Sequence, residues 1–206
     1  RLLAQEQPAK ADLVIPVPES GRRYAIGYSL ESGIPLDEGI MKDKDERSFI
    51  QQTQEHREKI VEEGLSFLHA VLENKRVVLI DDSIVRGTNM RKIIQGMKSV
   101  GVKEVHVRIG CPPLIAPCYL GIDMRSKKEF IARNSDGNIK AWELIAEEVG
   151  ADSLGYISSK GLKKAIGFDV CKGCIEFPDG YPPEMREDVQ KLFNNDKKGM
   201  RAYECI

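Results

Sequence analysis

The chain has 206 residues, of which 41% are hydrophobic and 31% charged, a composition typical of a globular protein and not of a disordered one. Its 31 basic and 32 acidic residues nearly cancel, so the sequence lacks the basic excess of a nucleic-acid-binding protein. No apolar stretch is long enough to cross a membrane, and no signal peptide opens the chain. Five cysteines, an odd number in a chain of this size, indicate a reducing compartment with free or metal-bound thiols, so we expect a cytoplasmic location.

Helical and strand-like patterns alternate along the first quarter of the sequence. The first six residues are helical in pattern and start without methionine, so we expect this chain to be a piece of a longer polypeptide. The run "ADLVIPVP" is apolar and closed by prolines, which predicts a buried strand. In chain order we predict a helix, a strand, a helix, a weaker strand and a charged loop at residues 1–6, 11–18, 20–33, 34–41 and 42–52.

The next two segments, residues 53–75 and 75–82, have different patterns. The apolar residues of the first fall at helical spacing and are Ile60, Leu65, Leu68, Val71 and Leu72. This spacing predicts a helix over part of the segment. The second segment, "KRVVLIDD", contains a continuous aliphatic run, which predicts a strand of a parallel sheet that is covered on both faces.

The remaining elements complete an α/β pattern. They are a helix, a strand, two helices and a strand at residues 88–101, 104–113, 126–134, 137–150 and 153–158. The alternation predicts an α/β fold with a mostly parallel sheet and helices on both faces. It fails after Gly167, where a Cys-, Gly- and Pro-rich segment precedes a charged stretch of about 20 residues that we interpret as a tail. We therefore divide the chain into a domain at residues 1–167 and a C-terminal extension at residues 168–206.

The stretch "VVLIDDSIVRGTNM" carries the most informative chemistry. Ligands of open parallel sheets lie beyond the carboxyl ends of the strands, where Asp81 and Asp82 are placed. A turn with Gly87 and a helix that starts near Thr88 aim backbone N–H groups and a partial positive charge at an anion. The neighbouring carboxylates accept hydrogen bonds from sugar hydroxyls or bind Mg²⁺. The stretch predicts a site for a phosphorylated sugar with a metal; the alternative is that the aspartates only end a strand and Thr88 only caps a helix.

This stretch resembles the phosphoribosyl pyrophosphate (PRPP) loop of the type I phosphoribosyltransferases. Its version, Asp-Asp-Ser-Ile-Val-Arg-Gly-Thr, is similar above all to that of the glutamine PRPP amidotransferase family. Further segments agree in the same order: "VIPVPESG", "AIGYSLESGIP", "RSFIQQTQEHREK", "PPLIAPCYLGIDM" and "EFIARN". The resemblance covers most of the chain, from Ala11 to the "CKGC" and "GYP" region, and implies the type I phosphoribosyltransferase fold.

The resemblance also implies a reaction and a role for each residue of the motif. Ammonia attacks C1 of PRPP and pyrophosphate leaves, giving 5-phosphoribosylamine in the first step of de novo purine synthesis. Asp81 and Asp82 would contact the ribose hydroxyls and Mg²⁺, together with Ser20, whose alternative role is to cap a helix. The residues that would hold the 5′-phosphate, largely through backbone amides, are Ser83, Ile84, Val85, Arg86, Gly87 and Thr88.

The charged loop after residue 41 resembles the segment that closes over PRPP. The cations that the resemblance brings near the diphosphate are Lys42, Lys44, Arg47 and Arg57. Of these, we predict Lys42 and Arg47 as catalytic; the alternative is a solvated charged loop. Compared with the family, the loop is one residue shorter and contains Asp43, Asp45 and Glu46. Their carboxylates oppose the charge of a diphosphate unless they point away from it.

The cysteines form a second candidate site. Cys118, Cys171 and Cys174 match three ligands of the structural 4Fe–4S cluster that one branch of the family carries. Tetrahedral zinc and three reduced structural thiols are the alternatives. The fourth ligand of that branch lies upstream of where this chain starts. We interpret Cys111 as a small core residue, and Cys205 as a stray thiol or a substitute ligand.

The glutaminase half of the family, which releases ammonia from glutamine, has no counterpart in this sequence. We expect this chain alone to use free ammonia, with a glutaminase domain or subunit upstream as its partner, and to form a homo-oligomer. Two alternatives stay open: a nucleobase-salvage phosphoribosyltransferase, and a non-catalytic module that senses PRPP. The segments around Gln54 and Cys118 argue against the first, and the altered closing loop leaves room for the second.

Overall fold

The fold is built on a parallel sheet. The computed structural model describes residues 1–42, 59–62, 64–122, 129–136 and 138–195. The four strands of the main sheet, in spatial order, are β1 (Leu13–Pro16), β5 (Arg76–Asp81), β6 (Glu104–Ile109) and β7 (Ser153–Tyr156). Every neighbouring pair in this sheet is parallel, so the predicted mostly parallel sheet is confirmed.

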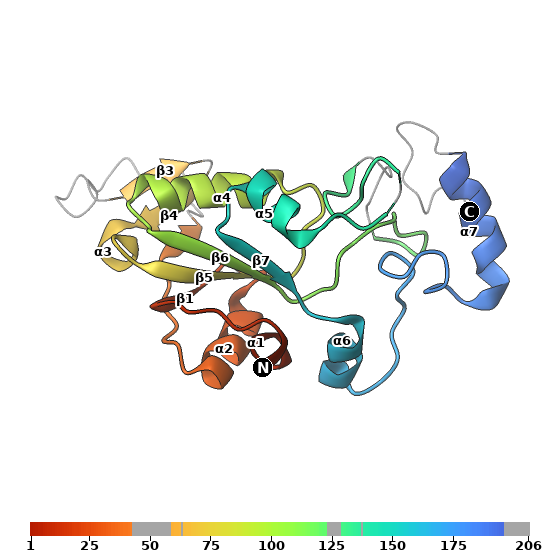
Figure 1. Ribbon diagram of the computed structural model, residues 1–206, viewed down its shortest axis with the longest axis horizontal. Coiled ribbons are helices and arrows are strands. Elements are labelled where there is room, and N and C mark those ends of the chain that lie inside the picture. Colours follow the sequence, from red (N-terminus) through yellow and green to blue (C-terminus); the bar gives the residue numbers. More distant parts are fainter. Residues whose placement is uncertain (43–58, 63, 123–128, 137, 196–206) are drawn as a thin grey trace.

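Helices cover both faces of this sheet (Figure 1). The helices on one face are α1 (Leu2–Glu6), α2 (Arg22–Ser32) and α6 (Ser159–Ile166). The helices on the other face are α4 (Thr88–Ser99) and α5 (Trp142–Val149). A short helix, α3 (His69–Leu72), precedes β5. The expected α/β architecture is confirmed, although α6 was not predicted from the sequence.

Strand β5 shows why the sheet is buried on both sides. Val77 and Leu79 belong to the core under α4 and α5, whereas Val78 and Ile80 pack with residues of α1 and α2. All four side chains are fully buried. Successive side chains of a strand point to opposite faces, so a strand between two helical layers needs an unbroken apolar run. That requirement explains the aliphatic sequence before Asp81.

A second, smaller sheet replaces part of the helix predicted over residues 53–75. Its strands, in spatial order, are β2 (Ile40–Lys42), β4 (Leu65–Leu68) and β3 (Lys59–Glu62), and both pairs are antiparallel. Gly64 precedes β4 with a φ of 79°, a left-handed conformation that ends a regular helix. Phe67 is fully buried against α4, where a Cβ at Gly96 would lie 2.3 Å from its ring. The helix prediction is therefore wrong for residues 59–68, because a long-range contact overrides the local spacing.

Two other predictions also fail in the described part of the chain. Residues 129–134 form turns and one isolated bridge, not the predicted helix, because Phe130, Ile131 and Ala132 are all buried in succession and leave no polar face. The charged sequence after residue 186 is not a tail throughout. A 3₁₀ turn (Pro183–Met185) leads into α7 (Arg186–Asn194).

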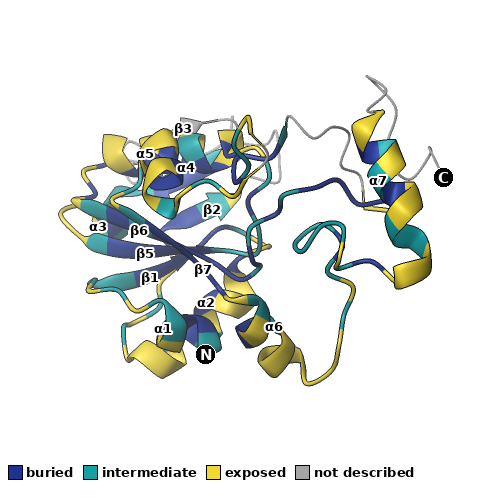
Figure 2. Ribbon diagram, turned by 45° about the vertical axis from the view of Figure 1, so that its right-hand side comes forward, coloured by how far each residue is buried: buried dark blue, intermediate teal, exposed yellow. Residues whose placement is uncertain are grey.

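The C-terminal extension shares a small core with the loop that follows β6, and its helix α7 lies away from the main sheet (Figure 2). This satellite core consists of the buried residues Ala116, Tyr119, Tyr181, Val189 and Phe193. The Tyr181 hydroxyl accepts a hydrogen bond from the Tyr119 N–H at 3.0 Å and donates one to the Pro117 carbonyl at 3.2 Å. The loop that follows β6 thus holds α7 and the Cys-rich segment together.

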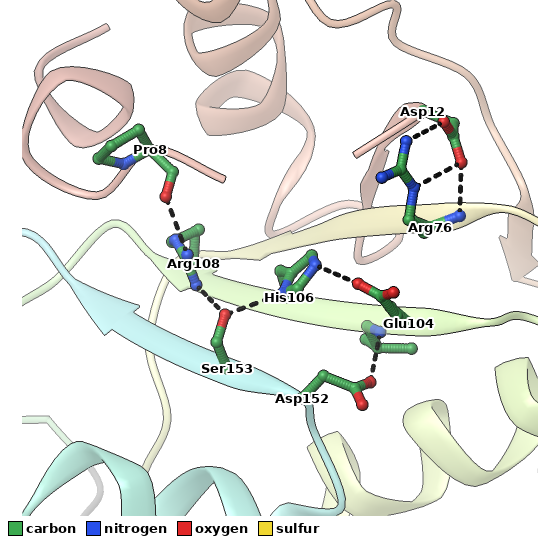
Figure 3. A network of polar contacts seen from close by, with 9 residues as sticks. Pro8, Asp12, Arg76, Glu104, His106, Arg108, Asp152 and Ser153 are labelled. Atoms are coloured by element: carbon green, nitrogen blue, oxygen red, sulfur yellow. Dashed lines mark hydrogen bonds and ion pairs between the residues drawn. The ribbon is translucent and has the colours of Figure 1, made fainter. Parts of the chain in front are cut away.

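Polar contacts bind the start of the chain to the main sheet (Figure 3). The Arg108 guanidinium is buried and donates to the carbonyls of Gln7 at 2.9 Å and Pro8 at 3.2 Å. It also donates to the Ser153 hydroxyl at 3.0 Å, which joins β6 to β7. The first residues therefore belong to this fold.

Among the described residues, no helix combines the length and apolarity that crossing a bilayer requires.

Candidate active site

The candidate site lies at the carboxyl end of β5, where the sequence placed it. Asp81 ends the strand, and the loop of residues 82–87 leads into α4. A cavity of about 1120 Å³ opens beside this loop. The loop residues that line it are Asp81, Asp82, Ser83, Ile84, Val85, Arg86, Gly87 and Thr88, and further lining residues include Ser20, Lys42 and Glu129. The structure thus brings Ser20, Lys42 and the whole predicted phosphate loop to one cavity.

The shape of the loop depends on Gly87. Its φ is 74°, in the left-handed region that costs other residues about 1–2 kcal/mol. A Cβ at this position would also lie 2.4 Å from Cδ1 of Ile131. The next anchor is Ile84, whose buried side chain enters the core under α4. Gly87, which has no side chain, and the buried side chain of Ile84 together fix the path of the loop.

The backbone amides of this loop are unpaired. Within the described residues, the N–H groups of residues 83–88 donate to no acceptor, and α4 has no side-chain cap at its N-terminus. Unpaired N–H groups and the positive end of a helix dipole attract an anion. The loop is therefore a candidate phosphate cradle, as the sequence predicted.

Asp81 is the more constrained of the two aspartates. Its Oδ1 accepts hydrogen bonds from the Ser20 hydroxyl at 2.6 Å and from the Asp82 N–H at 2.8 Å. Burial nevertheless raises the pKa of Asp81 to about 6, and the neighbouring charge of Asp82 adds to this effect. A cation bound to Asp81 would offset both the loss of solvation on burial and the repulsion from Asp82. Ser20, Asp81 and Asp82 therefore fit a Mg²⁺ ion, which commonly takes one or two carboxylates and completes its shell with water and phosphate.

Asp82 extends the site toward α2. Its Oδ1 accepts a hydrogen bond from the Ser83 hydroxyl at 3.3 Å. Burial and, second, the charge of Asp82 raise the pKa of Tyr24. The Tyr24 ring lies against Gly110, where a Cβ would be 2.2 Å from the ring. Tyr24 was not selected from the sequence, since one residue on a helix does not reveal which strand end it faces.

The structure describes only some of the positively charged residues that were predicted near the ligand. Lys42 ends β2, is exposed and lines the cavity, so it is placed to meet an anionic ligand. Arg47, together with Lys44 and Arg57, lies outside the described residues, and its role stays a prediction. Arg86 lines the cavity but directs its guanidinium to Glu129, donating from Nε at 3.0 Å and from Nη2 at 2.6 Å. The sequence analysis did not select Glu129.

The cysteines do not form a metal site among the described residues. Cys111, Cys118, Cys171 and Cys174 are free thiols, and no group of three His, Cys, Asp or Glu side chains in the described ranges is arranged to hold a metal ion. Burial raises the pKa of Cys174 to about 11, which disfavours the thiolate that ligation requires. The described residues therefore do not fit a 4Fe–4S cluster as they lie, and Cys118, Cys171 and Cys174 as ligands stay a prediction.

Comparison with known proteins identifies the class. Residues 2–133 match the family described as "Phosphoribosyl transferase domain". The match covers more than half of the chain, so the chain belongs to the phosphoribosyltransferase family, and its mostly parallel sheet with helices is that of the type I fold.

The similar proteins are more specific. An amidophosphoribosyltransferase of Methanocaldococcus jannaschii is 50% identical over 187 residues, which are 90% of this chain and 38% of that protein. The Bacillus subtilis amidophosphoribosyltransferase is 42% identical over 195 residues, 92% of this chain and 40% of that one. A solved glutamine PRPP amidotransferase from B. subtilis superposes with a TM-score of 0.72 at 42% identity, covering 88% of this chain and 40% of that chain. This chain thus spans about two fifths of the length of these relatives.

Proposed function

We propose that this chain binds PRPP with Mg²⁺ in the β5 cavity and transfers ammonia to C1, releasing pyrophosphate and giving 5-phosphoribosylamine. One observation carries the proposal: within the described residues, the loop amides of residues 83–88 have no acceptor, and they lie directly beside Asp81 and Asp82. PRPP carries a phosphate, a ribose ring with hydroxyls and a diphosphate that binds metal. The loop amides would bind the phosphate, and the neighbouring aspartates would bind the hydroxyls and the metal. The high identity to amidophosphoribosyltransferases supports ammonia as the acceptor.

Different residues of the cavity would bind different groups of PRPP. The loop amides and the α4 N-terminus hold the 5′-phosphate. Ser20, Asp81 and Asp82 are the groups that would hold Mg²⁺, which, when bound, neutralises charge on the departing diphosphate. Lys42, at the rim of the cavity, adds a positive charge on the same side as β2. We also propose that Arg47 contributes a cation there, on the family resemblance alone.

The chemistry follows from this division. The nitrogen lone pair of ammonia forms the bond to C1 as the bond from C1 to the diphosphate oxygen breaks, and the new ammonium group then loses a proton to solvent. Charge builds up on C1 and on the leaving diphosphate, so the protein contributes orientation and fixed dipoles rather than a nucleophile. The half-buried Asp81 and the loop fixed by Ile84 and Gly87 keep the ribose in one orientation.

The test is turnover of PRPP with ammonium, measured by pyrophosphate release. The unsubstituted chain is expected to release pyrophosphate in a Mg²⁺-dependent manner, and Asp82→Asn to lose most of this activity. Asp12→Asn, at the opposite end of the sheet, is the matched control and keeps the activity. Pyrophosphate release with nucleobases but not with ammonium would support the salvage alternative. PRPP binding by calorimetry without any release would support the non-catalytic module.

The partners of the full-length protein are part of the same proposal. Because the relatives are more than twice as long as this chain, we propose that a glutaminase unit supplies ammonia in the complete protein. The chain alone is then expected to use ammonium and not glutamine, and robust glutamine-dependent release by this chain would contradict that. A homo-oligomer is supported by the exposed Ile26 and Leu30 on α2, and sedimentation would test it.

The division of the chain is also proposed. Residues 1–167 would form the catalytic domain and residues 168–206 an extension, a division that the position of α7 away from the main sheet supports (Figure 1). Free thiols at four described cysteines agree with a cytoplasmic location. Iron analysis of protein purified without oxygen tests the cluster prediction, and no step of the reaction depends on it.

A further inference from the structure

A short buried segment crosses behind the phosphate loop. This crossing segment, residues 129–133, includes Phe130, Ile131 and Ala132, which are 3%, 5% and 0% exposed. Its other end is held by Arg133, which donates to the Ile115 carbonyl at 3.2 Å and lies 4.7 Å over the ring of Phe193. The crossing segment is therefore anchored in both cores and offers a fixed support to the loop.

One backbone hydrogen bond sets the orientation of a loop amide. The Ile131 N–H donates to the Val85 carbonyl at 2.8 Å. The carbonyl of Val85 and the N–H of Arg86 belong to the same trans peptide group and point in opposite directions. Because the carbonyl faces the crossing segment, the Arg86 N–H faces away from it. In the described structure this N–H has no acceptor, so it is held ready for a ligand.

The side chain of Arg86 is fixed by the same segment. Two of its N–H groups donate to a single oxygen, Oε2 of Glu129. The Glu129 side chain is 22% exposed, whereas that of Arg86 is 57% exposed. The carboxylate is thus the more fixed partner, and it draws the arginine toward the crossing segment.

We infer that Glu129 is a positioning residue for the phosphate cradle. Its pairing with Arg86 and the neighbouring bond from Ile131 hold the Val85–Arg86 peptide with its N–H free for the 5′-phosphate. The inference rests on the proposed function, because it concerns the phosphate half of the same site. The Mg²⁺ half, at Ser20 and Asp81, has its own contacts and does not depend on Glu129.

The test compares two ligands by calorimetry, ribose 5-phosphate for the loop and Mg²⁺-pyrophosphate for the aspartates. Glu129→Gln is expected to raise the Kd for ribose 5-phosphate about fivefold, the upper range for a partly exposed ion pair. The Kd for Mg²⁺-pyrophosphate is expected to stay within about twofold, because the contacts of Asp81 with Ser20 and Asp82 share no partner with the Arg86–Glu129 pair. Glu129→Asp keeps the charge but shortens the reach, so it is also expected to weaken ribose 5-phosphate binding.

Two further variants separate positioning from general stability. In an Arg86→Met background, Glu129→Gln is expected to add no further loss, because Glu129 acts through Arg86. Asp12→Asn breaks another arginine–carboxylate pair, at the far end of β5, and is expected to change neither affinity.

Each other outcome is decisive. Unchanged or tighter ribose 5-phosphate binding in Glu129→Gln would overturn the inference, and so would an equal loss for both ligands. Failure of the unsubstituted chain to bind either ligand would overturn the proposed function and this inference with it. Normal binding by that chain with no effect of Glu129→Gln would overturn this inference alone.

Discussion

Strand β5 starts beside one aspartate and ends on another, and the two carboxyl groups lie in opposite environments. At the start, Asp12 accepts from the Arg76 N–H at 2.9 Å and from its guanidinium at 2.8 Å, which lowers the pKa of Asp12 to about 2 (Figure 3). At the end, burial raises the pKa of Asp81 to about 6. The first carboxylate is paired with a guanidinium, whereas the second has a hydroxyl and a backbone N–H as its hydrogen-bond donors among the described residues.

The difference separates stability from function along one strand. A carboxylate that is paired with a guanidinium is stable in its charged form and needs no bound cation. A half-buried carboxylate whose nearest partners are a hydroxyl and another aspartate is destabilised in its charged form until a cation binds. Strained groups of this kind are concentrated at functional sites.

The largest expected effect is at the functional end. Asp81→Asn keeps the shape of the side chain and an oxygen that accepts from Ser20 and Asp82, but it removes the charge that attracts Mg²⁺. We expect Mg²⁺-dependent PRPP turnover to fall by at least about 100-fold, typical of losing a charge aimed at the reacting groups. Pyrophosphate release at saturating PRPP measures this. Activity within a few-fold of the unsubstituted chain would remove the contrast between the two ends.

The second effect concerns the loop backbone. Gly87→Ala places a Cβ in the left-handed region and against Ile131, which we expect to destabilise the protein by about 1–3 kcal/mol. The loop amides would shift, so ribose 5-phosphate is expected to bind about tenfold more weakly. Calorimetry and thermal unfolding of the same sample separate the two effects. Gly33→Ala, at a left-handed helix end with open space around it, is the matched control and should lower stability only.

The place of the candidate site at the end of β5 could be predicted from local sequence. The aliphatic run, the two aspartates and the glycine turn are neighbours in the chain, and each acts through short-range geometry. Glu129 was missed because it meets Arg86 across 43 residues of sequence. A single glutamate carries no pattern that names such a partner.

The same reasoning explains the errors in the fold. Ile60, Leu65 and Leu68 fit a helix by spacing, and only the packing of Phe67 against Gly96 selects strands. The described start of the supposed tail is a helix, α7, because Val189 and Phe193, four residues apart, are buried in the satellite core. Charged residues around them hid that short apolar face.

The third prediction uses the pKa of Asp81 in protein without metal. Its folded pKa of about 6 exceeds the unfolded value near 4, so the folded state binds more protons between these pH values. Stability should therefore fall as the pH rises from about 4 through 6, by about 1–2 kcal/mol relative to Asp81→Asn. Urea unfolding at several pH values, with EDTA present, measures the difference. Parallel stability curves for the two proteins would show that ionisation of Asp81 does not lower the free energy of unfolding.

The smallest expected effect is at the other end of the strand, with the opposite sign. The folded pKa of Asp12 lies at about 2, below its unfolded value near 4. Asp12 therefore contributes stability above pH 4 that is lost as the pH falls toward 2. The pair with Arg76 is solvent-exposed, so the contribution is small and screened by salt. Asp12→Asn should flatten the acid side of the stability curve and leave PRPP turnover unchanged, which urea unfolding from pH 5 to pH 2 would measure. An unchanged acid slope would show that the unfolded chain keeps the same pair, because only a difference between the folded and unfolded pKa values produces a slope.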